Sequence, residues 1–324
     1  MKPTCGISSS QVFFSVAAVT GCISVIFNMT SIDPVLDSSG GITPRRAFKF
    51  GPTYVVEPKG KHQATIVWLH GLGDDGLSWS QILETLPLPN IKWICPTSPV
   101  QPLTFLGGLS TTACWKVRVY AIAKVQDLWM LGFDVIDISE DAIQDVEGMD
   151  ASAAHVLSLL SNEPPNIKLG VGGFSMGAAT AIYSASCFAR GKLGNGTRYS
   201  AHLAAVVGLS GWLPCANHPS NEVEGPAASL PILLCHGRGD EVVWFRYGEK
   251  SAEKLTSAGF ENLTFKSFHS YACDFSFNFN HFQLPLSKNL KNRLGHYIIP
   301  EEMDEVSSWL TSKLELEGPQ PKIV

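Results

Sequence analysis

From residue 53 onward, short apolar runs alternate with longer mixed segments along the chain. Runs rich in β-branched or aromatic residues predict strands, and segments bounded by acidic residues, Pro or Gly predict helices. The predicted strands are Thr53–Val56, Thr65–Leu69, Ile91–Cys95, Leu169–Phe174, Leu203–Leu209, Ile232–Cys235 and Leu263–Phe268. The predicted helices are Ser80–Leu86, Ser139–Leu160, Phe245–Ser257 and Pro300–Leu316, and a run of small residues from Ala178 to Ala185 is helix-compatible.

This alternation indicates an α/β fold, with a mostly parallel central sheet and helices on both faces. Functional sites of such sheets lie at the carboxyl ends of the strands. We expect residues 46–324 to form a single domain and residues 1–45 to be a leader and linker. Residues 11–29 carry no charge, so they are either a signal or anchor segment or a leader outside the fold.

Composition narrows the function classes. The chain has 324 residues and a net charge of −5, which gives no reason to expect nucleic-acid binding. Its eight cysteines are scattered and form no C-x-x-C pair, which favours buried free thiols over disulfides or a zinc site. We therefore expect a cytoplasmic location; membrane association or secretion is the alternative if residues 11–29 act as a signal.

The most informative stretch is Gly173-Phe174-Ser175-Met176-Gly177, which lies between a predicted strand and a predicted helix. This is the G-x-S-x-G pattern in the strand–turn–helix context of a nucleophile elbow. Glycine on each side of the serine removes side chains that would clash where strand and helix converge. The alternative is a Gly/Ser-rich turn of an ordinary α/β protein.

A serine nucleophile needs a base, and the base needs an acid that orients it. In α/β hydrolases the chain order is serine, acid, histidine. Asp240 follows the strand Ile232–Cys235 and fits the acid. Three histidines come later: His269, His281 and His296. His296, beside Gly295 and just before the last helix, is the preferred base, and His269 is the fallback.

An oxyanion hole needs two backbone N–H donors. One is the N–H after the nucleophile, on Met176, and the other comes from the loop after an early strand. The turn His70-Gly71-Leu72-Gly73 is the natural source, through the Leu72 N–H. The turn lacks the pattern of a nucleotide-binding P-loop. His70 and His236 are expected to support the turns that they precede.

Taken together, these motifs resemble the acyl-protein thioesterase / phospholipase–carboxylesterase family, most closely its plant members, over about residues 46–317. The segments that carry the resemblance are His70–Asp74, Gly173–Gly177, Leu209–Pro214, His236–Asp240 and Gly295–Met303. The resemblance implies an α/β-hydrolase fold, no metal or cofactor, and a monomer or weak dimer. It implies hydrolysis of S-acyl (palmitoyl) thioesters on proteins, with activity on lysophospholipids or small esters and transient contact with a membrane surface.

Carried over by position, the resemblance assigns the triad to Ser175, Asp240 and His296, and the oxyanion donors to Leu72 and Met176. In the family, the loop that matches Pro99–Trp115 helps to build the acyl-binding groove. The expected substrate contacts in this loop are Leu103, Phe105, Leu106 and Trp115.

Two segments depart from the family pattern, at 116–132 and at 269–293. Both lack strong turn or capping signals, and we hypothesise that they are alternative or retained coding segments, which transcript reads across both junctions would test. Loop insertions cost little closure entropy. Because one lies beside the groove and the other precedes His296, a hydrolase-fold binding protein with little turnover stays open as an alternative. A carboxylesterase or lysophospholipase acting on small esters is the other alternative, and only the depth of the groove separates it from a thioesterase.

Overall fold

The structure is a computed structural model that describes residues 48–102, 110–114, 144–215, 223, 225–269 and 295–317. The expected leader at 1–45 lies outside these residues, as does the segment 116–132. Of the segment 269–293, only His269 is described. Within the described ranges, no helix is both long and apolar enough to cross a bilayer.

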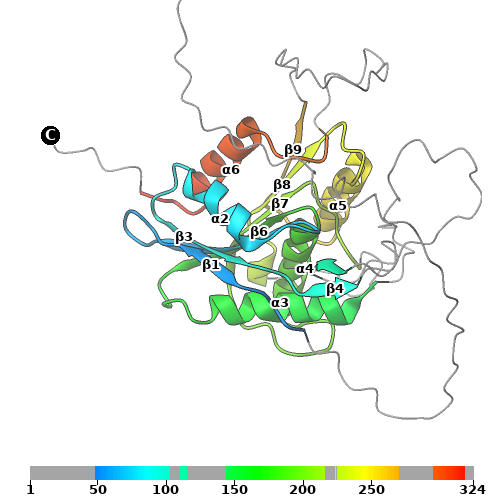
Figure 1. The fold of residues 1–324 in the computed structure, drawn as a ribbon, viewed down its shortest axis with the longest axis horizontal. Helices are drawn as coiled ribbons and strands as arrows, with labels where there is room; N and C mark the ends of the chain where they lie inside the picture. Colours follow the sequence, from blue (N-terminus) through cyan, green and yellow to red (C-terminus); the bar gives the residue numbers. More distant parts are fainter. Residues whose placement is uncertain are drawn as a thin grey trace, which may run out of the picture. The chain divides into compact units, whose positions relative to one another are not determined.

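A seven-stranded sheet forms the centre of the fold, in the order β1-β3-β2-β6-β7-β8-β9 (Figure 1). The strand β1 pairs antiparallel with β3, and the other pairings of this sheet are parallel. The strands are β1 (Thr53–Val56), β2 (Ala64–Leu69), β3 (Ile91–Pro96), β6 (Lys168–Phe174), β7 (Leu203–Leu209), β8 (Ile232–Gly237) and β9 (Leu263–Phe268). The predicted mostly parallel sheet is thereby confirmed.

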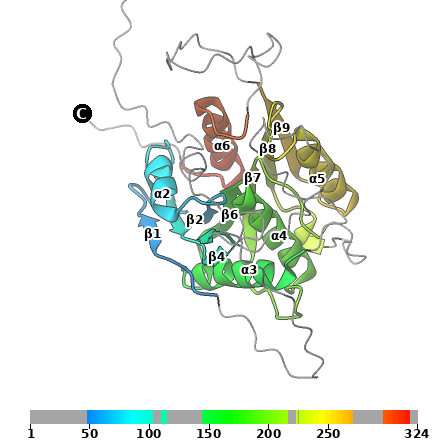
Figure 2. The ribbon, with the colours of Figure 1, turned by 45° about the vertical axis from the view of Figure 1, so that its right-hand side comes forward.

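Helices cover both faces of the sheet, as Figure 2 shows. On one face α3, α4 and α5 pack against the strands, and on the other face α2 and α6 do so. The helices are α2 (Gly76–Glu84), α3 (Val146–Leu160), α4 (Met176–Arg190), α5 (Phe245–Ser257) and α6 (Pro300–Lys313), with a short 3-10 helix at Gly225–Ala227. The predicted α/β-hydrolase fold is confirmed.

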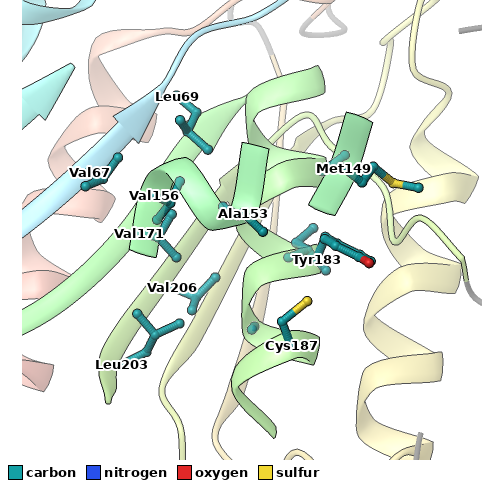
Figure 3. Close-up of a cluster of buried hydrophobic side chains, with 14 of the residues drawn as sticks. Val67, Leu69, Met149, Ala153, Val156, Val171, Tyr183, Cys187, Leu203 and Val206 are labelled. Atoms are coloured by element: carbon teal, nitrogen blue, oxygen red, sulfur yellow. The ribbon is translucent and has the colours of Figure 1, made fainter. Parts of the chain in front are cut away.

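The apolar side chains of the strands pack into two separate cores, one on each face of the sheet, because successive side chains of a strand point to opposite faces. In β2, Val67 and Leu69 join the core under α3 and α4, whereas Ile66 and Trp68 join the core under α2 and α6. Figure 3 shows the first of these cores. Burying one such aliphatic side chain contributes about 1.5–3 kcal/mol, so each strand anchors helices on both sides.

Two predicted helix starts are wrong, and capping explains both. The helix α2 begins at Gly76 instead of Ser80, because the Asp75 side chain accepts a hydrogen bond from the Ser78 N–H at 2.8 Å. The helix α3 begins only at Val146, because Asp145 caps the Gly148 N–H. A capping carboxylate satisfies one of the free N–H groups of the first turn and so sets where the helix begins.

The segment predicted as a loop at 99–115 contains two short strands. They are β4 (Val100–Pro102) and β5 (Ser110–Thr112), which pair antiparallel in a sheet of their own. The Gly73 N–H donates to the Thr112 carbonyl at 2.9 Å, and the Thr112 hydroxyl donates to the Asp74 carbonyl at 2.7 Å. The strand pair is therefore attached to the loop that follows β2.

A buried carboxylate ties α3 to α4, the helix that follows Ser175. Asp150 is 3% exposed. It accepts hydrogen bonds from the Tyr183 hydroxyl and from the N–H groups of Gly194 and Asn195, each at 2.7 Å. One side chain thus holds two helices and the turn beyond α4.

We predict that Asp150→Ala lowers the free energy of unfolding by about 3 kcal/mol, because three buried donors lose their acceptor. Urea denaturation of both proteins measures this difference. Glu84→Ala is the control: the Glu84 side chain is 58% exposed in a surface pair with Lys59, so its loss should cost less than about 1 kcal/mol. An Asp150→Ala protein as stable as wild type would contradict the structural role of the carboxylate.

Candidate active site

Ser175 lies at the sharp turn between the central strand β6 and α4. Its backbone has φ 56° and ψ −119°, a left-handed conformation that is rare for a residue with a side chain. The Ser175 N–H donates to the Leu209 carbonyl of the neighbouring strand at 2.8 Å, which helps to hold this conformation. Strain of this kind persists only where the surrounding structure enforces it.

Two glycines make the turn possible. A Cβ on Gly173 would lie 2.6 Å from the Leu69 carbonyl oxygen, and a Cβ on Gly177 would lie 2.2 Å from the same oxygen. These separations are far inside van der Waals contact, so no other residue fits without moving the backbone of β2. The G-x-S-x-G spacing is therefore a consequence of how closely β2, β6 and α4 approach.

The structure brings Ser175, His296 and Asp240 together in one hydrogen-bonded line. His296 Nε2 lies 2.9 Å from the Ser175 hydroxyl, and His296 Nδ1 lies 2.8 Å from Asp240 Oδ2. The carboxylate can only accept, so Nδ1 carries the proton and Nε2 is free to accept the serine proton. The other described candidate, His269, is exposed at the end of β9.

The loop after β8 fixes the acid. Asp240 Oδ1 accepts from the N–H groups of Val242 at 3.0 Å and Val243 at 2.8 Å, which leaves Oδ2 directed at His296. His236 Nε2 lies 2.7 Å from the Val243 carbonyl, so this histidine supports the turn. Burial lowers the pKa of His236, which keeps it neutral as a hydrogen-bond donor.

A second histidine supports the loop after β2. The Ser98 N–H donates to His70 Nε2 at 2.9 Å, so Nδ1 carries the ring proton and donates to the Gly71 carbonyl at 2.6 Å. Burial lowers the pKa of His70, which favours this neutral form. The loop is thus held on both sides of Leu72, by His70 at Gly71 and by β5 at Gly73.

This loop lies directly beside the nucleophile. A Cβ built on Gly71 would be 3.4 Å from the Ser175 Cβ. Met176 is the first residue of α4, where a backbone N–H has no partner within the helix. Met176 therefore adjoins Ser175 in the chain, and Leu72 directly follows the glycine that lies beside Ser175.

The predicted substrate contacts Leu103, Phe105, Leu106 and Trp115 lie outside the described residues. The strands β4 and β5, which flank the first three, are attached to the loop that carries Leu72, as described above. Within the described part of the chain, no group of three or more His, Cys, Asp or Glu side chains could hold a metal ion.

Two residues near the site escaped the sequence analysis. Phe174, the variable second position of G-x-S-x-G, packs its ring against that of His296, with 4.9 Å between the centroids. Glu302 is one of two acids in the first turn of α6, yet it is fully buried. Burial raises its pKa to about 8, and the charge of Asp240 acts in the same direction. The Pro300-Glu301-Glu302 sequence contains no signal that distinguishes the buried acid from the exposed one.

The sequence pattern of the Phospholipase/Carboxylesterase family matches residues 51–277 of this chain. The chain belongs to this family. The matched segment includes Ser175 and Asp240. His296 lies beyond it, so the case for this base rests on the two hydrogen bonds given above. Membership confirms the resemblance inferred from the motifs and makes the protein a hydrolase of the α/β class.

Named relatives agree with this assignment. The crystal structure of acyl-protein thioesterase 2 from Zea mays is 53% identical, covers 82% of this chain and 99% of its own, and superposes with a TM-score of 0.67. Acyl-protein thioesterase 1 of Cryptococcus neoformans is 27% identical over 80% of this chain and 96% of its own length. The Arabidopsis thaliana SOBER1 structure, at 22% identity and a TM-score of 0.55, shares the fold.

We predict that Glu302→Gln becomes more stable relative to wild type as pH rises from 5 to 8. In this window the folded wild type keeps the Glu302 proton while the unfolded chain has lost it. The wild type therefore becomes less stable as pH rises. Its unfolding equilibrium constant increases by up to about tenfold for each pH unit. Gln carries no such proton.

Urea denaturation at several pH values measures the difference between the two proteins. Glu301→Gln removes an exposed carboxylate from the same turn and reports the effect of charge loss alone. If the wild-type and Glu302→Gln stabilities stay parallel across the range, Glu302 is ionised in the folded protein and the prediction is wrong.

Proposed function

We propose that this protein is an acyl-protein thioesterase, which hydrolyses S-acyl thioesters such as S-palmitoyl cysteine on proteins. The observation that carries the proposal is the hydrogen-bonded line from Ser175 through His296 to Asp240. The relatives at 53% and 27% identity are named acyl-protein thioesterases, which supports the substrate class.

In the first half-reaction, the Ser175 hydroxyl attacks the thioester carbonyl while His296 Nε2 takes its proton. The carbonyl oxygen becomes an oxyanion, which the N–H groups of Leu72 and Met176 stabilise. The C–S bond then breaks, and the imidazolium returns the proton to the departing sulfur. The products are a free cysteine thiol and an acyl ester on Ser175.

In the second half-reaction, water attacks the acyl ester and His296 takes a proton from it. The new tetrahedral intermediate collapses, Ser175 regains its proton from the imidazolium, and the fatty acid leaves. Asp240 keeps the histidine in the required tautomer and stabilises its positive charge in both halves. No metal or cofactor takes part in this scheme.

The acyl chain is proposed to bind beside the strand pair β4–β5. Its proposed contacts are Leu103, Phe105, Leu106 and Trp115. Exposed apolar side chains support a surface that meets lipid chains. Leu77, Val100, Trp244 and Tyr297 are 38–67% exposed. In the chain, the first three come after β2, β3 and β8, whose carboxyl ends lie at one edge of the parallel sheet, and Tyr297 follows His296. We propose that this edge touches a membrane surface transiently when an acylated protein is bound.

We further propose that the protein works in the cytoplasm, as a monomer or weak dimer. The five described cysteines are free, and burial raises the pKa of Cys95 and Cys187 to about 12. Such thiols are inert packing groups and suit a reducing compartment. A reporter fused to residues 1–45 that entered the secretory pathway would contradict this location.

We predict that a fluorophosphonate probe labels Ser175 of the full-length protein. Peptide mass spectrometry identifies the modified residue, and Ser175→Ala should not be labelled. His296→Ala should react at least about 1000-fold more slowly, because the serine then lacks its base. A folded wild-type protein that remains unlabelled would favour the alternative of a hydrolase-fold binding protein.

We also predict a preference for long-chain thioesters over short acetyl esters. The comparison of kcat/KM on an S-palmitoyl peptide, an S-octanoyl peptide and an acetyl ester measures it. Each additional methylene buried in the groove contributes about 0.8 kcal/mol, so the preference should grow with chain length until the groove is filled. Faster hydrolysis of acetyl esters would favour the small-ester carboxylesterase instead.

A further inference from the structure

The His296 imidazole donates one hydrogen bond and accepts another, and ring nitrogens make both of them in the plane of the ring. One joins Nδ1 to Asp240 and the other joins Nε2 to Ser175. Neither contacts a face of the imidazole, so neither opposes a tilt of the ring out of its plane. Along its own segment His296 has little support, since Gly295 has no side chain and Tyr297 is 41% exposed. Packing from another element must hold the ring.

Phe174 supplies that packing. Its ring centroid lies 4.9 Å from that of His296, with 38° between the planes. The Phe174 ring is itself held by Trp79 of α2, at 5.9 Å and 35°. Trp79 is only 3% exposed and packs in turn on Trp68 at 5.4 Å. The imidazole therefore rests on a chain of ring contacts that begins in the core under α2 and α6.

Phe174 also touches the loop that carries Leu72. A Cβ on Gly71 would lie 3.2 Å from Phe174 Cδ1, so the ring fills the space beside that loop. Phe174 directly precedes Ser175 in the chain. The turn that presents the serine to His296 therefore also brings the Phe174 ring against the imidazole. One side chain thus contacts both the base and the proposed oxyanion loop.

We propose that Phe174 is a positioning residue for His296, holding one face of the imidazole and stabilising its protonated form during acyl transfer. This inference rests on the proposed function. The histidine becomes an imidazolium as the serine attacks, and a cation within about 6 Å of an aromatic centroid is attracted by the ring. The attraction is stronger in the charged transition state than in the resting enzyme, so it lowers the barrier and leaves substrate binding unchanged.

The test measures kcat and KM on a water-soluble S-octanoyl peptide for the full-length protein and its variants. Phe174→Leu removes the ring and keeps an apolar side chain. We expect its kcat to fall about 10-fold, which lies between the effects of an exposed and a fully desolvated cation–π contact, with KM within about twofold. Phe174→Tyr keeps the ring and should restore kcat to within about threefold of wild type.

The chain offers a matched control. Phe188 in α4 makes a ring contact with His202, at 5.1 Å between centroids, away from the triad. Phe188→Leu removes a Phe–His contact of the same kind and should keep the wild-type kcat and KM. Thermal melts confirm that every variant is folded at the assay temperature. If Phe174→Leu is not folded, Phe174→Met takes its place, because methionine fills irregular space.

The results distinguish the role of the Phe174 ring from the proposed thioesterase function. A wild-type kcat in Phe174→Leu, or equally low values in Phe174→Leu and Phe174→Tyr, would overturn the role of the ring. A lower kcat together with a higher KM in Phe188→Leu as well as Phe174→Leu would show general loosening and also overturn it. A wild-type protein that neither hydrolyses the peptide nor reacts with fluorophosphonate would overturn the proposed function, and this inference with it.

Discussion

The close approach of three backbone segments at the end of β6 is the constraint on which the site depends. The Leu69 carbonyl lies so near Gly173 and Gly177 that any side chain there would overlap it. Because β2, β6 and α4 meet at this distance, the chain must reverse at Ser175 with a positive φ. The same contact directs the serine hydroxyl away from both elements. It also brings the loop after β2 to the side of the nucleophile.

The other two members of the proposed triad are held by elements on the other side of Ser175. The loop after β8 presents Asp240, and two backbone N–H groups occupy one of its carboxylate oxygens. The segment before α6 presents His296. The helix α6 anchors this segment by burying Met303 and Val306 in the core that it shares with α2. Three loops from distant parts of the sequence thus meet at one edge of the sheet, as expected for the carboxyl ends of parallel strands.

Neutral buried groups lie close to the hydrogen-bonded residues Ser175, His296 and Asp240. His70 and His236 are both buried, which lowers the pKa of each ring and keeps it neutral, and each donates a hydrogen bond to a carbonyl in a loop of the site. Glu302 is also kept neutral at moderate pH by its burial. Because two backbone N–H groups occupy Oδ1 of Asp240, Oδ2 is left to accept from His296 Nδ1. The aromatic stack through Phe174 and Trp79 completes the surroundings on the side of α6 and α2.

The sequence alone determined the order of strands and helices, the α/β-hydrolase class, and the identity of Ser175, Asp240 and His296 as candidates. These signals are local, because hydrophobic periodicity, glycine spacing and strand ends can each be recognised within a short window. Tertiary structure decided what depends on distant segments meeting. It chose His296 over His269, buried Glu302 beside exposed Glu301, and set the Phe174 ring against the base. Neighbours in space, not in sequence, determine the burial and the ring contacts of a side chain, and no local pattern encodes them.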